Sequence, residues 1–122
     1  MIYYNGDWRA YDGIDGGSVH TGMIPATGDW QFVAVVYDQD EQTVTMYVDG
    51  TAVTNTGQLL GPSVNMFRIG NNESNGAEFF NGLIDEVFVI RGALSTSELD
   101  QIRLNGVRSL FMSHSHVIRN MN

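Results

Sequence analysis

The sequence predicts an all-β fold, an antiparallel sandwich with one short helix in its second half. Three observations support this prediction: short apolar runs rich in β-branched residues, tight-turn pairs such as Asn5-Gly6 and Asp49-Gly50, and one helix-capping pattern at 95–98. The chain has 122 residues, of which 43% are hydrophobic, which is enough for one domain with one core. We therefore expect residues 1–122 to form a single sandwich domain, with an irregular tail at 107–122.

Two of the expected strands have distinct patterns. Residues 30–37 are apolar on both faces, as in a central strand that is covered on both sides. Residues 43–49 alternate instead, which places Val44, Met46 and Val48 on one face of a strand. The expected strands are, in chain order, 1–4, 8–11, 18–23, 30–37, 43–49, 51–54, 65–70 and 83–90.

One helix is expected after residue 95. Ser95 and Glu98 have the spacing of a capping box, in which the side chain of each residue accepts a hydrogen bond from the backbone N–H of the other. Leu99 and Ile102 lie three residues apart and predict the buried stripe, and Gly106 predicts the end of the helix.

Several segments resemble one known family. Residues 28–38 contain Gly28, Trp30 and Tyr37-Asp38 at the spacing usual in laminin-G-like domains of the concanavalin A-like lectin and glucanase jelly rolls. Residues 44–50, 80–87 and 91–95 resemble the hairpin, the closing strand and the short helix of the same family. The resemblance covers roughly residues 28–104 and implies a jelly-roll sandwich.

Members of that family usually have further strands before the position of Met1. Three explanations are open for their absence: residues 1–27 and the tail at 107–122 replace those strands, the chain is a fragment, or a neighbouring subunit completes the sandwich. A half-sandwich alone exposes a large apolar face and unpaired strand edges. We therefore expect a homo-oligomer or a larger assembly.

The charge of the chain limits its partners. The net charge is −8 and lysine is absent, so the surface repels nucleic acid and anionic lipid. Such a surface suits metal cations and neutral ligands such as sugars, although an acidic charge also simply keeps a protein soluble. No apolar run reaches 18 residues, so we expect no membrane insertion. The expected location is extracellular or associated with a surface or virion, although this chain shows no signal peptide.

Asp85 is the first candidate metal ligand. It alternates with Leu83 and Val87 in the strand expected at 83–90, and a carboxylate among apolar side chains needs a cation or hydrogen-bond donors. The family resemblance implies a structural calcium near this position, and Asp12 and Asp15 in a glycine-rich loop could add oxygens. The alternatives are that Asp85 accepts backbone N–H groups or pairs with an arginine, and that the loop is a plain turn.

A polar loop predicts the candidate ligand surface. Amide side chains can pair with sugar hydroxyls, and a nearby aromatic such as Trp8, Tyr11 or Phe79 can stack on a sugar ring. The alternative is a solvated loop beside core aromatics. The candidate ligand-binding residues are Asn71, Asn72, Glu73, Asn75, Trp8 and Tyr11.

The sequence argues against catalysis. Glucanases of this topology place three carboxylates on one strand face as Glu-x-Asp-x-x-Glu, whereas Asp85 and Glu86 are adjacent here and Leu83 occupies the first position. We expect a non-catalytic module that recognises a carbohydrate or cell-surface glycan, or a surface protein. The alternative is a structural module of a virion, tail or surface layer whose sandwich is completed by neighbouring subunits.

Overall fold

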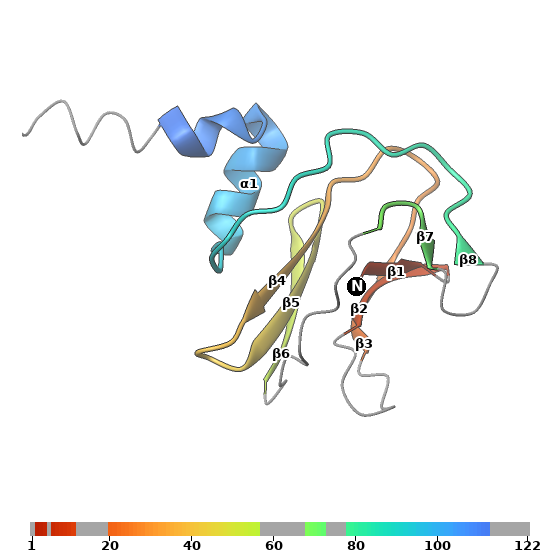
Figure 1. The fold of residues 1–122 in the computed structure, drawn as a ribbon, viewed down its shortest axis with the longest axis horizontal. Coiled ribbons are helices and arrows are strands. Elements are labelled where there is room, and N and C mark those ends of the chain that lie inside the picture. Colours follow the sequence, from red (N-terminus) through yellow and green to blue (C-terminus); the bar gives the residue numbers. More distant parts are fainter. Residues whose placement is uncertain (1, 5, 12–19, 57–67, 73–77, 113–122) are drawn as a thin grey trace, which may run out of the picture.

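Figure 1 shows the fold in a computed structural model, which describes residues 2–4, 6–11, 20–56, 68–72 and 78–112. In this part of the chain, short strands occupy the first two thirds and a helix follows near the end. The elements are β1 (Ile2–Tyr4), β2 (Asp7–Tyr11), β3 (His20–Pro25), β4 (Val33–Asp38), β5 (Thr43–Val48), β6 (Thr51–Thr56), β7 (Asn71–Asn72), β8 (Glu78–Phe79) and α1 (Thr96–Asn105).

The strands form antiparallel sheets. β1, β2 and β3 make one three-stranded sheet in that order, β4, β5 and β6 make a second, and β7 pairs with β8 alone. The turn between β5 and β6 has positive φ at both Asp49 (47°) and Gly50 (94°). This geometry matches the twist of a two-residue hairpin, as the Asp-Gly pair predicted.

The first core lies between the two three-stranded sheets. Val44, Met46 and Val48 of β5 are buried there against Ala10 of β2. The side chains of Trp8, Ile24, Val33, Val35 and Tyr37 pack around this cluster. The alternation predicted for residues 43–49 is therefore confirmed, and the two sheets form the sandwich.

The second core lies on the opposite face of the β4–β6 sheet. Tyr47 is buried there with Leu99 and Ile102 of α1 and with Leu110. Phe32, Ala34, Val36, Phe88, Ile90, Leu94 and Val107 pack against this cluster. The helix and the segment before it thus make a third layer, which covers the face of the sheet turned away from β1–β3.

The helix begins and ends as the sequence predicts. Ser95 Oγ accepts a hydrogen bond from the Glu98 amide, and the Glu98 carboxylate accepts one from the Ser95 amide at 2.8 Å, which completes the capping box. Gly106 closes the helix with φ 78° and donates its N–H to the Ile102 carbonyl at 2.7 Å. Leu99 and Ile102 are buried, as expected from their spacing.

A polar contact joins the helix to the sheet. The Tyr47 hydroxyl donates to Asp100 Oδ1 at 2.5 Å, and Arg103 Nε donates to the same hydroxyl at 3.2 Å. The Asp100 pKa is lowered because its carboxylate accepts hydrogen bonds, first from Tyr47 and then from Arg103. The Tyr47 pKa is raised, chiefly by burial and next by its bond to Asp100.

The structure corrects the expectation for residues 83–90. No described strand pairs with this segment, which Figure 1 draws as a trace that leads from β8 toward α1. A strand needs a partner for its backbone, and none of the described strands supplies one. The part of the expected strand 65–70 that is described, residues 68–70, is likewise not a strand.

Two further expectations change around β4. Among the described strands, β5 is the centre of its sheet and β4 its edge, although β4 is covered on both faces as predicted. Trp30, expected to begin this strand, lies before it and is exposed. Phe32 also lies before the strand, and its ring is edge-on to Tyr47 at 5.8 Å and stacked on Phe88 at 6.3 Å.

The tail expected to be irregular at 107–122 is helical at 108–112, and its other end, 113–122, lies outside the described residues. Leu110 belongs to this helical turn and is buried against α1 and Tyr47. The first part of the tail therefore belongs to the core.

The Tyr47→Phe variant should flatten the pH dependence of stability at both ends. The lowered pKa of Asp100 contributes stability that is present above its ordinary value of 3.8 and is lost as pH falls through the lowered value. The raised pKa of Tyr47 contributes stability that is present below 10.0 and is lost as pH rises through the raised value.

Urea unfolding midpoints across this pH range measure the effect. The wild type should lose stability more steeply than Tyr47→Phe in acid and in alkali, whereas Gln101→Ala, an exposed change on the same helix, should follow the wild type. Identical pH profiles for the wild type and Tyr47→Phe would show that this contact contributes nothing.

Candidate functional site

The β7–β8 hairpin presents an aromatic and an amide side chain to solvent. Asn71 lies directly opposite Phe79 across the two strands. Both are exposed, and the Phe79 ring retains 71% of its accessible surface. The Phe80 amide donates to the Gly70 carbonyl at 2.8 Å, which closes the hairpin at its open end. A polar and an aromatic group are thus held side by side on one short hairpin.

The ring next to this hairpin anchors it to the sandwich. Phe80 stacks on Trp8 of β2 with ring centroids 6.0 Å apart and an angle of 30°. Trp8 Nε1 donates to Gln31 Oε1 at 2.9 Å, and the same oxygen accepts the Thr27 amide at 3.2 Å. A Cβ on Gly82 would lie 2.7 Å from the Phe80 ring, so only glycine fits there without movement of the ring.

The structure brings together some of the residues predicted to bind ligand. Asn71 and Trp8 come to the same end of the sandwich, joined through Phe80, and Figure 1 places β7 and β8 beside β1 and β2. Trp8 is half-buried in its stack, so it supports the hairpin rather than offering a free face. At Tyr11 the structure describes the backbone, which pairs with His20, and leaves the Tyr11 side chain outside the described part. The side chain of Asn72 and the whole of Glu73 and Asn75 also lie outside the described part.

The sequence indicates Phe79 only as one of three nearby aromatics and gives no sign of the parts played by Phe80 and Gln31. The register of β7 with β8 places Phe79 beside Asn71, and two strands of two residues leave too little alternation to predict that register. The contact of Phe80 with Trp8 spans more than 70 positions and has no local signal.

Asp85 is exposed, and its Oδ1 accepts the Glu86 amide at 2.8 Å. This is the backbone-acceptor alternative that the sequence left open. Asp12 and Asp15 lie outside the described residues, and within the described part no three histidine, aspartate or glutamate side chains gather as a metal site. Calcium takes six to eight oxygens, so Asp85 alone cannot hold it, and the calcium assignment stays a prediction.

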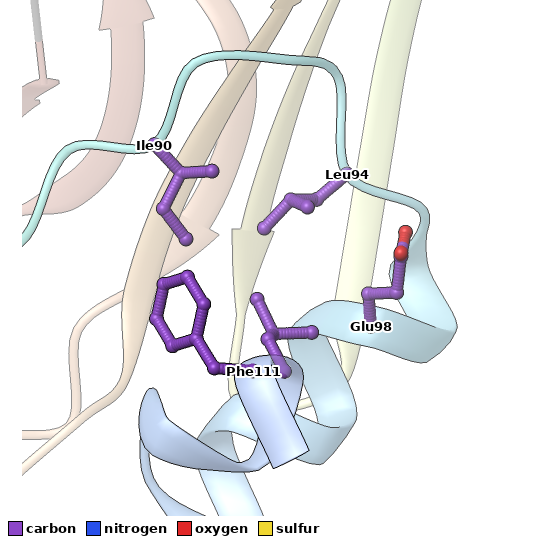
Figure 2. A pocket seen from close by; sticks show the side chains of 5 residues that line it. Ile90, Leu94, Glu98 and Phe111 are labelled. Atoms are coloured by element: carbon purple, nitrogen blue, oxygen red, sulfur yellow. The ribbon is translucent and has the colours of Figure 1, made fainter. Parts of the chain in front are cut away.

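An apolar pocket of about 320 Å³ lies between the 90–94 segment, α1 and the helical turn 108–112. Figure 2 shows Ile90, Leu94 and Phe111 converging on it. Glu98 is the one charged side chain of the lining, and its carboxylate is held by the capping box at Ser95. The pocket therefore offers contact area but little polar recognition. The lining residues are Ile90, Leu94, Glu98, Leu110 and Phe111.

The two layered sheets and the helix that covers one of them define a β-sandwich module. A family model of the laminin-G type, described as the concanavalin A-like lectin/glucanases superfamily, matches residues 2–100. The chain belongs to this superfamily. The match confirms the resemblance seen in the sequence and extends it to the first strands, where no family pattern was recognised.

One solved structure shares the fold. It is an S-layer domain-containing protein from Clostridium thermocellum, similar at a TM-score of 0.52 and 24% sequence identity. The alignment covers 70% of this chain and 44% of that one, so the chain spans less than half the length of the structure it matches. No curated protein matches the chain significantly. None of the described helices is long and apolar enough to cross a membrane.

If the backbone bond is the whole role of Asp85, calcium should leave the thermal unfolding midpoint of the wild type unchanged. Scanning calorimetry with added calcium and with a chelator measures this. A calcium-dependent rise that Asp85→Asn abolishes would support the predicted assignment to Asp85. A rise that survives in Asp85→Asn would move the ion elsewhere and make Asp12 and Asp15 the next variants.

Proposed function

We propose that the chain is a non-catalytic module that binds neutral glycans at an extracellular or cell surface through the β7–β8 end of its sandwich. The observation that carries this proposal is the exposed Phe79 ring directly opposite the exposed Asn71 amide. An aromatic face and an amide side by side can recognise a sugar ring and its hydroxyls together.

The support beneath this hairpin favours binding. Ligand affinity is lost when side chains must be ordered on binding, and the Trp8–Phe80 stack with its bond to Gln31 orders the base of the hairpin in advance. Asn72, Glu73 and Asn75 lie within four positions after Asn71 in the sequence and would add polar groups next to it. Tyr11 ends the strand that carries Trp8.

Charge and carboxylate placement agree with a neutral ligand and with binding alone. A chain of net charge −8 repels anionic ligands and leaves uncharged sugars unaffected. Glycoside hydrolysis needs two carboxylates facing each other across the bond that is cleaved. Asp85 and Glu86 are sequence neighbours on one exposed segment, and Asp85 is engaged with the Glu86 amide.

A second function, as a subunit of a surface assembly, is supported by a different observation. Leu83, Val87 and Val89 are exposed on the segment that was expected to be a covered strand. Large aliphatic side chains that gather on one surface mark contact sites in soluble proteins. The solved structure with the same fold is described as an S-layer domain-containing protein, which is consistent with such a role.

Phe79→Ala should weaken glycan binding about fivefold or more, because a stacked ring contributes on the order of 1 kcal/mol and a tenfold change corresponds to about 1.4 kcal/mol. Binding is measured first on an array of neutral glycans and then by calorimetry with the best ligand. Phe111→Ala is the matched control, since Phe111 is exposed to 67% and lies on the helical turn 108–112, away from the hairpin.

Wild-type binding that survives in Phe79→Ala would move the site elsewhere on the module. No binding by the wild type to any neutral glycan at millimolar concentration would overturn the glycan proposal and leave assembly as the function.

A further inference from the structure

Only positions 88 and 90 of the segment 83–91 are half-buried, and its other residues are exposed. Phe88 and Ile90 pack against the cluster around Tyr47, so the segment is fixed to the third layer. Leu83, Val87 and Val89 keep 78%, 49% and 75% of their accessible surface. The alternation of the last four positions is that of a strand with two apolar faces, of which the chain itself covers one.

Among the residues that the structure describes, no strand pairs with the backbone of this segment. The Glu86 amide bonds the side chain of its neighbour Asp85. Glu86 has φ 49°, in the left-handed region that residues other than glycine rarely adopt. Strain of this kind persists at sites that change on binding, and pairing would return Glu86 to an extended conformation.

We propose that residues 83–91 pair antiparallel with the same segment of a second copy of this chain, around a two-fold axis at Val87. This inference rests on the assembly function proposed above and names its partner and its interface. Two identical free edges complete each other's hydrogen bonds, and a two-fold contact closes after two subunits.

The sequence of the segment fits this register in its charges. With Val87 opposite its own copy, Asp85 lies opposite Val89 of the other chain, so no two carboxylates face each other. Asp85 then lies diagonal to Arg91 of the other chain, within reach of a long side chain. Arg91 is exposed and forms no ion pair with any other described residue, so it is available for this contact.

The apolar positions fit as well. The exposed Leu83, Val87 and Val89 share one face of the paired strands, where their partners are Arg91, Val87 and Asp85 of the other copy. The two Val87 side chains meet at the axis, and the aliphatic stem of Arg91 covers Leu83. Association in this way places these aliphatic side chains against neighbours of the other copy, which shield part of each from water.

The net charge of the chain predicts different salt dependences for a second copy and for a cationic partner. Two chains of charge −8 repel each other, and salt screens that repulsion, so self-association should strengthen as salt rises. A cationic partner would show the opposite dependence. The salt dependence of association therefore distinguishes a second copy of this chain from a cationic partner at the edge.

Sedimentation equilibrium of the whole chain, from about 1 µM to about 200 µM and at low and high salt, tests the proposal. The wild type should form a dimer, more tightly at high salt. Val87→Arg should raise the dimer dissociation constant at least about tenfold, because two guanidinium groups then meet at the axis. Val53→Arg is the matched control on exposed β6 and should leave the dimer unchanged.

A charge exchange makes the test specific to this register. Asp85→Arg alone should weaken the dimer, since the new guanidinium lies diagonal to Arg91 of the other chain, although the change lowers the net repulsion between the chains. Asp85→Arg combined with Arg91→Asp should restore the dimer. Far-UV circular dichroism of each variant checks that the sandwich is folded.

The possible results distinguish a failure of the 83–91 interface from a failure of the proposed assembly function. An oligomer that is indifferent to Val87→Arg and to the charge exchange would overturn this interface and leave assembly standing. A monomer at every concentration and salt would overturn both. Glycan binding by the Val87→Arg variant should equal that of the wild type, because the β7–β8 hairpin does not include this segment.

Discussion

The fold depends on the burial of β5 from both sides. Val44, Met46 and Val48 fill the space against the first sheet, and Tyr47 fills the space against α1. One six-residue strand thereby joins all three layers. The hydroxyl of Tyr47 also forms hydrogen bonds with Asp100 and Arg103 of the helix. Because hydrogen bonds are directional, they fix the orientation of the helix on the sheet in addition to the apolar contacts. A substitution in β5 would therefore disturb the packing of one or both cores.

The three layers leave two surfaces that the core does not use, and these are where function is proposed. At one end, the β7–β8 hairpin rests on the Trp8–Phe80 stack and exposes Phe79. Along the third layer, Phe88 and Ile90 are packed against the core, whereas Val87 and Val89 between them are exposed. The first surface suits a small neutral ligand and the second suits a strand, so the two proposals concern different surfaces and can be tested separately.

Local features of the sequence predicted local structure well. The capping box at Ser95, the stop at Gly106 and the Asp49-Gly50 turn all follow from backbone chemistry within a few residues. Residues 83–90 were predicted as a strand from the same kind of pattern, but a strand also needs a partner, and composition carries no information about one. The candidate site was harder still, because Phe80 meets Trp8 only through the fold.

Among the described strands β5 is the protected centre, whereas residues 83–90 are the edge proposed to pair with a second copy. Hydrogen exchange followed by NMR at low protein concentration tests this most directly. Slow exchange is expected for the paired amides of β5 and fast exchange for those of 83–90, which should slow as protein concentration rises. Slow exchange at 83–90 in the dilute monomer would contradict it, because those amides would then already have partners within the chain.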